Sequence, residues 1–142
     1  MSKEKWNHSN IPNQKGKVVI ITGATSGLGK EAVKVLAAKG ATIIAAVRNT
    51  EKAQKVVEEI KKTIPNASID IQKLDLVSLE SIKTFAEKIT STYDQLDLLI
   101  NNAGVMMPVQ RFETKQGIEG QFGTNHLGHF VLTNELFDLI EK

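Results

Sequence analysis

The sequence holds 142 residues, the length of one domain, with 18 basic and 16 acidic side chains interspersed along it. The near balance of charge excludes the basic stripe of a nucleic-acid-binding protein, and the absence of cysteine excludes disulfides, thiolate chemistry and cysteine metal sites. No apolar run approaches the length of a membrane span or of a signal peptide, so we expect a cytoplasmic protein.

Strand-like and helix-like segments alternate after a polar tail over residues 1–15. Short apolar runs and alternating patterns predict strands at residues 17–22, 42–47, 68–74 and 96–100. Apolar residues at helical spacing predict helices at 27–39, from Thr50 to just before Pro65, from Ser78 onward, and over about 114–141. We expect Thr50 and Ser78 to cap their helices. The inward residues of these two helices are expected to be Ala53, Val56, Val57 and Ile60, and Leu79, Ile82, Ala86 and Ile89.

The alternation predicts an α/β fold in which helices cover both faces of one parallel sheet. The runs 18–21 and 43–47 are apolar throughout, which indicates strands that are buried on both sides. Right-handed crossovers then give a doubly wound sheet with strand order 3-2-1-4. Ligands of such sheets bind at the carboxyl ends of the strands, where the order reverses. At these ends stand Thr22 with Gly23, Arg48, Asp75 and Asn101.

A glycine-rich turn joins the first strand to the first helix, with Gly23, Gly27 and Gly29 in the spacing G-x-x-x-G-x-G. Glycine permits positive φ and close approach of backbone to a ligand, and the free N–H groups of the helix start favour an anion. The pyrophosphate of a dinucleotide fits such a site. A phosphate-binding P-loop does not fit, because Glu31 stands where Ser or Thr must bind magnesium. A tight strand–helix turn without any ligand remains the alternative.

Arg48 stands where an acidic residue would bind the 2′-hydroxyl of an adenosine ribose. A guanidinium there attracts a 2′-phosphate instead, through charge-assisted hydrogen bonds worth about 1.5–3 kcal/mol. We therefore expect NADP(H) to be preferred over NAD(H). Lys52, one turn into the next helix, could add a second positive charge. The alternative is that Arg48 is a solvated residue at a strand end.

Two further segments follow strand ends. Asp75 could accept a hydrogen bond from an adenine amino group, or it could be a turn carboxylate ahead of Ser78. In the segment 101–104, Asn101 and Asn102 could bridge backbone groups, and Ala103 with Gly104 leaves room for a cofactor to pass. For this segment the spacing favours neither a structural nor a functional role.

Taken together, these motifs resemble the short-chain dehydrogenase/reductase family. The resemblance rests on Thr22-Gly23-x-x-x-Gly27-x-Gly29, the Asp75 turn, Asn101-Asn102-Ala103-Gly104 and Asn125. The stretches 101–108 and 121–130 are similar to the branch with retinol dehydrogenases and WW-domain oxidoreductases. The resemblance covers residues 16–142 and implies a Rossmann-type fold, with hydride transfer between a nicotinamide and an alcohol or carbonyl compound. It also suggests a lipophilic substrate.

The resemblance implies a role for each matching position. The glycine turn, with Thr22, Gly23, Ser26, Gly27, Leu28 and Gly29, holds the pyrophosphate. Arg48 with Lys52 takes the 2′-phosphate, Asp75 with Leu76 the adenine, and Asn101, Ala103 and Gly104 form the wall beside the riboses. Asn125 supports a proton relay; without the family, a helix-interior amide that packs or bends the helix is the simpler interpretation. His126 and His129 lack a third partner for a metal and are expected to pack or face solvent, and we expect no metal site.

One departure from the family's pattern concerns the acid–base residues. The family uses a Ser and a Tyr-x-x-x-Lys pair in a strand and helix beyond residue 142, whereas Tyr93 is the single tyrosine here and is followed four residues later by Asp97. The Rossmann-type domain is therefore expected to be incomplete. We expect the 142-residue chain to bind cofactor but to be inactive alone.

An apolar strand left at the sheet edge predicts pairing with another chain. The residues concerned are 96–100, so a homo-oligomer through this open edge is a possible partner arrangement. Three interpretations stay open: a truncated oxidoreductase, a module that dimerises through the edge, and a cofactor-binding pseudoenzyme with a protein partner. An interaction scaffold that never binds nucleotide is a fourth, disfavoured by Arg48 and the intact glycines.

Overall fold

The computed structural model describes residues 5–142 and contains a four-stranded parallel sheet with the order β3-β2-β1-β4. The strands are β1 (Val18–Thr22), β2 (Thr42–Val47), β3 (Ser68–Lys73) and β4 (Leu98–Ile100). This order confirms the predicted doubly wound arrangement. The strand bounds agree with the predicted ones within one residue, except that β4 begins two residues later.

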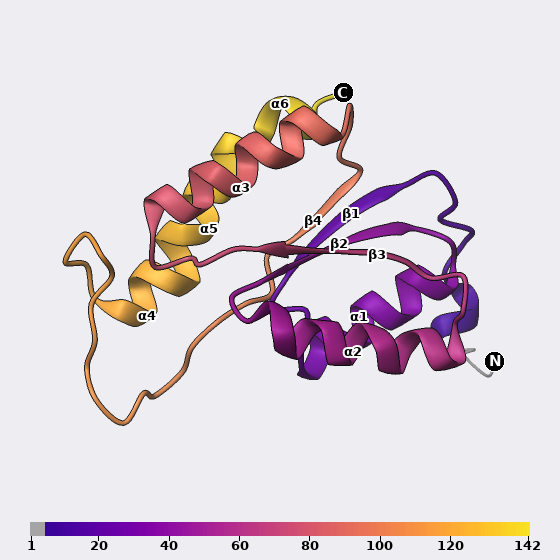
Figure 1. Ribbon diagram of the computed structural model, residues 1–142, viewed down its shortest axis with the longest axis horizontal. Coiled ribbons are helices and arrows are strands. Elements are labelled where there is room, and N and C mark those ends of the chain that lie inside the picture. The colour runs from indigo at the N-terminus through magenta and orange to yellow at the C-terminus, as the bar shows by residue number, and fades with distance from the viewer. Residues whose placement is uncertain (1–4) are drawn as a thin grey trace.

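Helices cover both faces of the sheet (Figure 1). On one face lie α1 (Gly27–Ala38) and α2 (Thr50–Thr63), and on the other lie α3 (Leu79–Thr92), α5 (Gly128–Glu135) and α6 (Phe137–Ile140). Successive strand residues point to opposite faces, so the inner strands β1 and β2 contribute to two cores. Ile20 and Ile44 pack towards α3 and α5, whereas Ile21 and Ile43 pack towards α1 and α2. Both faces are therefore dry, which explains the uninterrupted apolar runs.

Helix caps refine the predicted boundaries. Asn49, not Thr50, is the N-cap of α2, because its side chain accepts a hydrogen bond from Lys52 N at 2.8 Å. Ser78 caps α3 as predicted and accepts from Ser81 N at 3.3 Å. The inward face of α3 differs at one position: Leu79 is 39% exposed, and Phe85 takes a place in the core. Leu79 is the first residue of α3, and at a helix end the apolar periodicity alone does not determine burial.

The predicted helix over 114–141 is wrong in its first part. Residues 113–119 form a turn closed by a bridge between Glu113 and Glu119, and α4 (Gly120–Phe122) begins only after it. Glu119 sets this start, since its carboxylate accepts from Gln121 N and Phe122 N at 2.9 and 2.8 Å. These two hydrogen bonds lower the pKa of Glu119.

A π-helical turn, Gly123–Leu127, separates α4 from α5, and we call it the π turn. Glycine is required at its first residue and directly after it for close packing. A Cβ at Gly123 would lie 2.2 Å from Thr114 Cγ2, and one at Gly128 would lie 2.6 Å from the carbonyl oxygen of Leu76. The C-terminal helical region is thereby held against the segment that follows β3. π-Helical turns occur frequently at functional sites.

Asp97 ties β4 to the start of β1. Its carboxylate accepts from Val18 N at 2.8 Å and from Lys17 Nζ at 3.0 Å. The hydrogen bond from the Val18 N–H lowers the pKa of Asp97 most, and the hydrogen bond from Lys17 lowers it next. Stability from this group is therefore present above the unfolded-state pKa and is lost as pH falls through the folded-state pKa.

We expect Asp97→Asn to lower the free energy of unfolding by about 1 kcal/mol at pH 7, because a charged acceptor is replaced by a neutral one at a partly solvated site. The difference from the wild type should shrink as pH falls below 4. Urea unfolding at pH 7 and at pH 3 measures both values. Asp94→Asn, at an exposed neighbouring carboxylate, is the control. An equal difference at both pH values would contradict the assignment.

No helix within residues 5–142 is long and apolar enough to cross a membrane.

Candidate functional site

A cleft of about 410 Å³ opens at the carboxyl ends of the strands. Residues at or after the carboxyl ends of all four strands line it, so the strand ends meet at one site, as the sequence predicted. Its lining comprises Thr22, Gly23, Thr25 and Ser26 at and after the end of β1, Ala46, Val47, Arg48, Asn49 and Lys52 at and after the end of β2, Leu74, Asp75, Leu76 and Val77 after β3, Asn102, Ala103, Gly104 and Val105 after β4, and Phe112 and Thr124. Most of the predicted cofactor residues therefore lie at one cleft.

Gly27, Leu28, Gly29 and Asn101 are the predicted cofactor residues that do not line the cleft. The first three form the first turn of α1, directly after the lining residue Ser26. Asn101 is exposed, and its amide donates to Thr133 Oγ1 on α5 at 3.1 Å. Its neighbour Asn102 lines the cleft and does the bridging: Nδ2 donates to the carbonyl oxygen of Thr22 at 3.0 Å.

The glycines of the turn have distinct structural reasons. A Cβ at Gly29 would lie 2.3 Å from the carbonyl oxygen of Gly23, and one at Gly23 would lie 2.9 Å from Ala103 Cα. Gly29 therefore permits α1 to pack closely against the turn, and Gly23 permits the segment after β4 to do so. Gly27 has φ +52°, and a Cβ there would meet nothing within 4 Å. The space beside Gly27 is open, as a bound anion requires.

The start of α1 differs from the starts of α2 and α3. Its N-cap residue, Ser26, makes no side-chain capping hydrogen bond, whereas Asn49 and Ser78 each cap their helix. The first turn of α1 also carries no acidic side chain. The N–H groups of this turn are thus left to an external acceptor, and the helix dipole makes that acceptor an anion.

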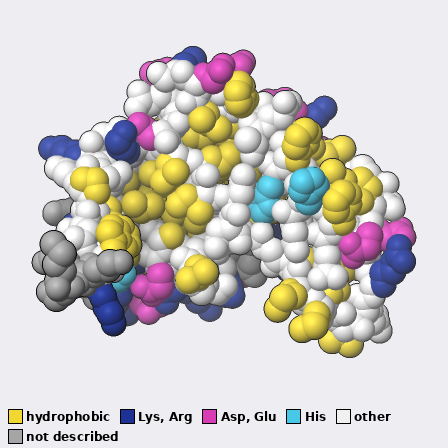
Figure 2. All heavy atoms as spheres, turned by 180° about the vertical axis from the view of Figure 1, so that it is seen from behind, with side chains coloured by type: hydrophobic (Ala, Val, Ile, Leu, Met, Phe, Trp, Pro, Cys, Tyr) yellow, Lys and Arg dark blue, Asp and Glu magenta, His cyan; other side chains and the backbone are white. Residues whose placement is uncertain are grey.

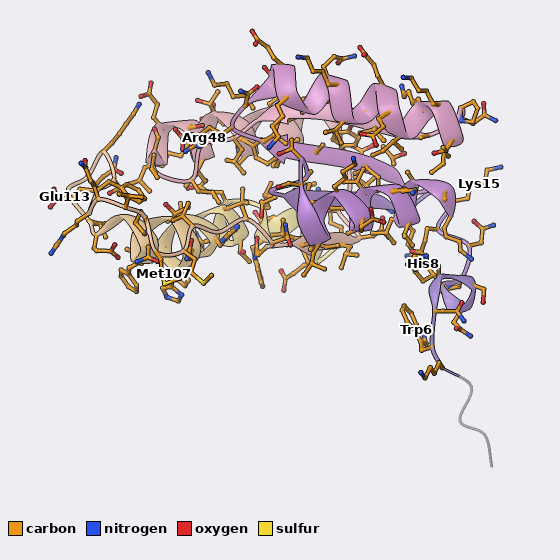
Figure 3. All side chains as sticks on the ribbon, turned by 90° about the horizontal axis from the view of Figure 1, so that it is seen from below. Trp6, His8, Lys15, Arg48, Met107 and Glu113 are labelled. Atoms are coloured by element: carbon orange, nitrogen blue, oxygen red, sulfur yellow. The ribbon has the colours of Figure 1, made fainter. Side chains whose placement is uncertain are left out.

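Arg48 and Lys52 bring positive charge to the same cleft. Within residues 5–142 the ion pairs are Lys17–Asp97 and Lys30–Glu59, so neither cation has a carboxylate partner there. Arg48 is exposed, and Figure 3 shows it at the same end of the molecule as Met107 and Glu113, away from Trp6, His8 and Lys15. Two cations without partners suit a ligand with a second anionic group.

Asp75 has the turn role that the sequence left open, and it also lines the cleft. Its Oδ1 accepts from Val77 N at 3.3 Å, and its own N–H donates to Ser81 Oγ at 2.9 Å. The carboxylate is thereby fixed at the cleft wall beside Leu76. A structural role and a ligand role are compatible at this position.

Thr22 joins the end of β1 to the wall formed by residues 102–105. Its hydroxyl is buried and accepts from Asn102 N and Ala103 N, each at 2.9 Å. Asn125 fastens the far end of that wall, since its amide accepts from Val105 N and donates to Val105 O, both at 2.8 Å. Asn125 itself does not line the cleft, and its side chain makes these two hydrogen bonds to the backbone of Val105.

Thr124 is a cleft residue that the sequence did not indicate. It is 8% exposed, and its Oγ1 is a buried atom without a hydrogen-bond partner within the described chain. Such a group costs about 1–3 kcal/mol unless a ligand or water satisfies it. Only its place next to Asn125 could have drawn attention to it. Phe112, Asn49 and Val77 also line the cleft without a sequence signal.

Tyr93 lies away from this site. It ends α3, its hydroxyl donates to Asp70 Oδ2 at 3.4 Å, and burial raises its pKa. Neither residue lines the cleft. The tyrosine of this chain is therefore not placed to exchange a proton with a ligand there.

Known proteins similar to this chain identify its family. A model of the short chain dehydrogenase family matches residues 17–142, and the chain belongs to this family. It is 46% identical over 126 residues to human retinol dehydrogenase 13 and 50% identical over 124 residues to the short-chain dehydrogenase TIC 32 B, chloroplastic, of Brassica napus. These alignments cover 89% and 87% of this chain but 38% of each relative.

Solved structures agree with the fold. An uncharacterized protein from Mycobacterium paratuberculosis superposes with a TM-score of 0.82 at 40% identity, over 94% of this chain and 46% of that one. A short chain dehydrogenase from Shigella flexneri 2a, complexed with NADP, superposes with a TM-score of 0.75 at 29% identity, over 92% and 56% of the two chains. The family and the Rossmann-like fold expected from the sequence are thus confirmed.

Proposed function

We propose that this chain is the cofactor-binding part of an NADP-dependent short-chain dehydrogenase/reductase acting on an alcohol or carbonyl compound. The observation that carries the proposal is an uncapped α1 N-terminus directly after the cleft residue Ser26, with two cations in the same cleft that have no carboxylate partner within residues 5–142. The orphan hydroxyl of Thr124 and the open space beside Gly27 also fit a bound group. NADP in the related Shigella flexneri structure supports the choice of cofactor.

The residues of the cleft divide the cofactor between them. The N–H groups of the first turn of α1, opened by Gly23 and Gly27, would hold the pyrophosphate. Arg48 and Lys52 would hold the 2′-phosphate through charge-assisted hydrogen bonds. Asp75 and Leu76 would bind the adenine, and Ala103 with Gly104 would shape the ribose side. The bound nicotinamide supplies the hydride chemistry, and these residues orient it.

Catalysis is assigned to the longer protein that the relatives represent. In the sequence the single tyrosine is Tyr93, and neither a suitable Ser nor a Tyr-x-x-x-Lys pair accompanies the cleft. Asn125 would have a supporting role only. We expect the 142 residues alone to bind NADP(H) without measurable turnover, since loss of a general acid–base group costs about 10²–10⁴-fold in rate. A lipophilic alcohol or aldehyde is the proposed substrate class, by analogy with the name of retinol dehydrogenase 13.

A cofactor-binding pseudoenzyme or interaction scaffold is the second candidate, because the chain carries exposed apolar surface. Leu98 on the edge strand β4 is 42% exposed, and Phe122, Phe130 and Phe137 are exposed on the C-terminal helices. Figure 2 shows apolar side chains gathered on one face of the molecule. Homo-oligomerisation through the β4 edge and a cytoplasmic location stay predictions. The mass of the protein in solution tests the first.

Thermal unfolding with added coenzyme separates coenzyme binding from an interaction scaffold that never binds nucleotide. We expect NADPH at 100 times its Kd to stabilise the chain by about 2.7 kcal/mol, and NADH at the same concentration to stabilise it less. Circular dichroism is the suitable readout, because Trp6 lies in the exposed N-terminal segment and reports poorly on the cleft. No shift with saturating NADPH or NADH would favour the scaffold.

A further inference from the structure

His129, on α5, is buried and hydrogen-bonded at both ring nitrogens. It is 6% exposed, whereas His8 and His126 are exposed. Its Nδ1 lies 3.1 Å from the carbonyl oxygen of Asn125 in the π turn, and its Nε2 lies 2.9 Å from Thr22 Oγ1 at the end of β1. The ring therefore bridges β1 and the π turn, and its partner Thr22 is 107 residues away in sequence.

The partners of the ring determine its tautomer. A carbonyl oxygen can only accept, so Nδ1 carries the hydrogen that Asn125 O receives. Thr22 Oγ1 already accepts from Asn102 N and Ala103 N, which occupies both of its lone pairs. Its own hydrogen is free to be donated, and His129 Nε2 at 2.9 Å is a closer acceptor than Ile100 O at 3.4 Å. His129 is thus neutral, with a hydrogen on Nδ1 and a lone pair on Nε2.

The neutral ring is the only form that satisfies this network. A second hydrogen on Nε2 would point at an oxygen without a free lone pair. Burial also lowers the pKa of His129, and the hydrogen bond to Asn125 O opposes this only in part. Within the described chain, no charged side chain of β1, of the wall after β4, of α3 or of the π turn shifts the pKa of His129 further. The neighbouring His126 is exposed and stacks on Phe122.

We propose that His129 is a positioning residue, which holds the π turn against Thr22 and thereby sets the 102–105 wall of the cofactor cleft. The wall has two attachments, Thr22 at Asn102 and Ala103, and Asn125 at Val105. His129 contacts both attachment residues, so it fixes the distance between them. This inference rests on the proposed function, because the wall matters for affinity only if the cleft binds a nicotinamide coenzyme.

The first test measures the network without any coenzyme. We expect the ¹⁵N shifts of the His129 ring at pH 7 to report the neutral tautomer with hydrogen on Nδ1. We also expect His129→Leu to speed hydrogen exchange at the amides of Asn102 and Ala103, and His129→Gln to restore part of the protection, because its amide oxygen can accept from Thr22. His126→Leu, in the adjacent π turn and exposed, is the control and should leave exchange unchanged.

The second test measures NADPH affinity between pH 7.5 and pH 5. We expect His129→Leu to weaken binding about tenfold at pH 7.5, the loss of roughly one hydrogen bond. Wild-type affinity should fall more steeply on acidification than that of the variant, once pH passes below the usual histidine pKa of about 6.5. The 2′-phosphate itself titrates with a pKa of about 6, and its effect on affinity is the same in the wild type and the variant, so it cancels when the two are compared.

The outcomes separate the two proposals. If the wild type does not bind NADPH, the proposed function fails, and the exchange rates at Asn102 and Ala103 then decide the inference alone. Unchanged exchange in His129→Leu overturns it, as does unchanged NADPH affinity in a protein that binds. Should the Leu variant not fold, the wild-type tautomer and the Gln variant decide: a ring with hydrogen on Nε2, or a charged ring at pH 7, overturns the inference.

Discussion

Arg48→Asp is expected to reverse the coenzyme preference of the chain. The substitution removes a guanidinium that has no carboxylate partner within the described residues and places a negative charge at the same cleft wall. Losing charge-assisted hydrogen bonds of about 1.5–3 kcal/mol weakens NADPH binding by about 10- to 150-fold, and repulsion adds to this. The affinity for NADH should stay the same or increase, since a carboxylate can accept a hydrogen bond from the ribose 2′-hydroxyl.

Titration calorimetry with both coenzymes measures this reversal. Lys15→Asp is the matched control, because it makes the same change in net charge at an exposed site at the opposite end of the molecule (Figure 3). The control should leave the ratio of the two affinities unchanged. If the Arg48 variant still binds NADPH far more tightly than NADH, another group selects the 2′-phosphate, and Lys52 is then the residue to test.

Gly29→Ala is expected to lower the free energy of unfolding by at least about 2–3 kcal/mol and to abolish coenzyme binding. An added Cβ would lie 2.3 Å from the carbonyl oxygen of Gly23 and 2.6 Å from Asn102 Nδ2. Gly23 O belongs to the backbone, so α1 must move away from the strand ends to relieve the overlap. The gain in helix propensity from Gly to Ala, about 1 kcal/mol, is too small to offset this.

Urea unfolding and an NADPH titration measure the two parts of this prediction. Gly104→Ala is a control for stability, because its Cβ would lie 3.4 Å from Asn125 Oδ1, close to ordinary van der Waals contact. It should change the free energy of unfolding by well under 1 kcal/mol. A Gly29 variant as stable as the wild type would show that α1 is less tightly seated on the turn than the packing indicates.

The strands and their order could be predicted because their signals are local. Runs such as that of β2 are apolar on both faces, and right-handed crossovers leave few ways to connect them. For the same reason, Arg48 and Asp75 could be predicted to lie at strand ends. What the sequence pattern did not reveal depends on partners far along the chain. Asn102 rather than Asn101 bridges to Thr22, and this depends on a hydrogen bond between residues 80 apart.

The C-terminal region illustrates the limit most clearly. Apolar periodicity predicted one helix over 114–141, yet Glu119 caps a helix that starts at Gly120, and the π turn then interrupts it. The interruption places Thr124 at the cleft and brings His129 to Thr22. A π turn shifts the register of the helix, so residues beyond it face directions that a period of 3.6 does not predict. Helical spacing therefore could not indicate either residue.

The central position of β1 has a consequence for synthesis of the protein. β1 pairs with β2 on one side and with β4 on the other, and Val18 is bonded to Asp97, 79 residues later. At translation rates of about 5–20 residues per second, the nascent chain waits roughly 4–16 s before that second neighbour is made. During this interval the largely apolar β1 offers an open edge to any passing chain. A ribosome-bound chaperone that shields it would raise the yield of folded protein, and one that releases before β4 emerges would not.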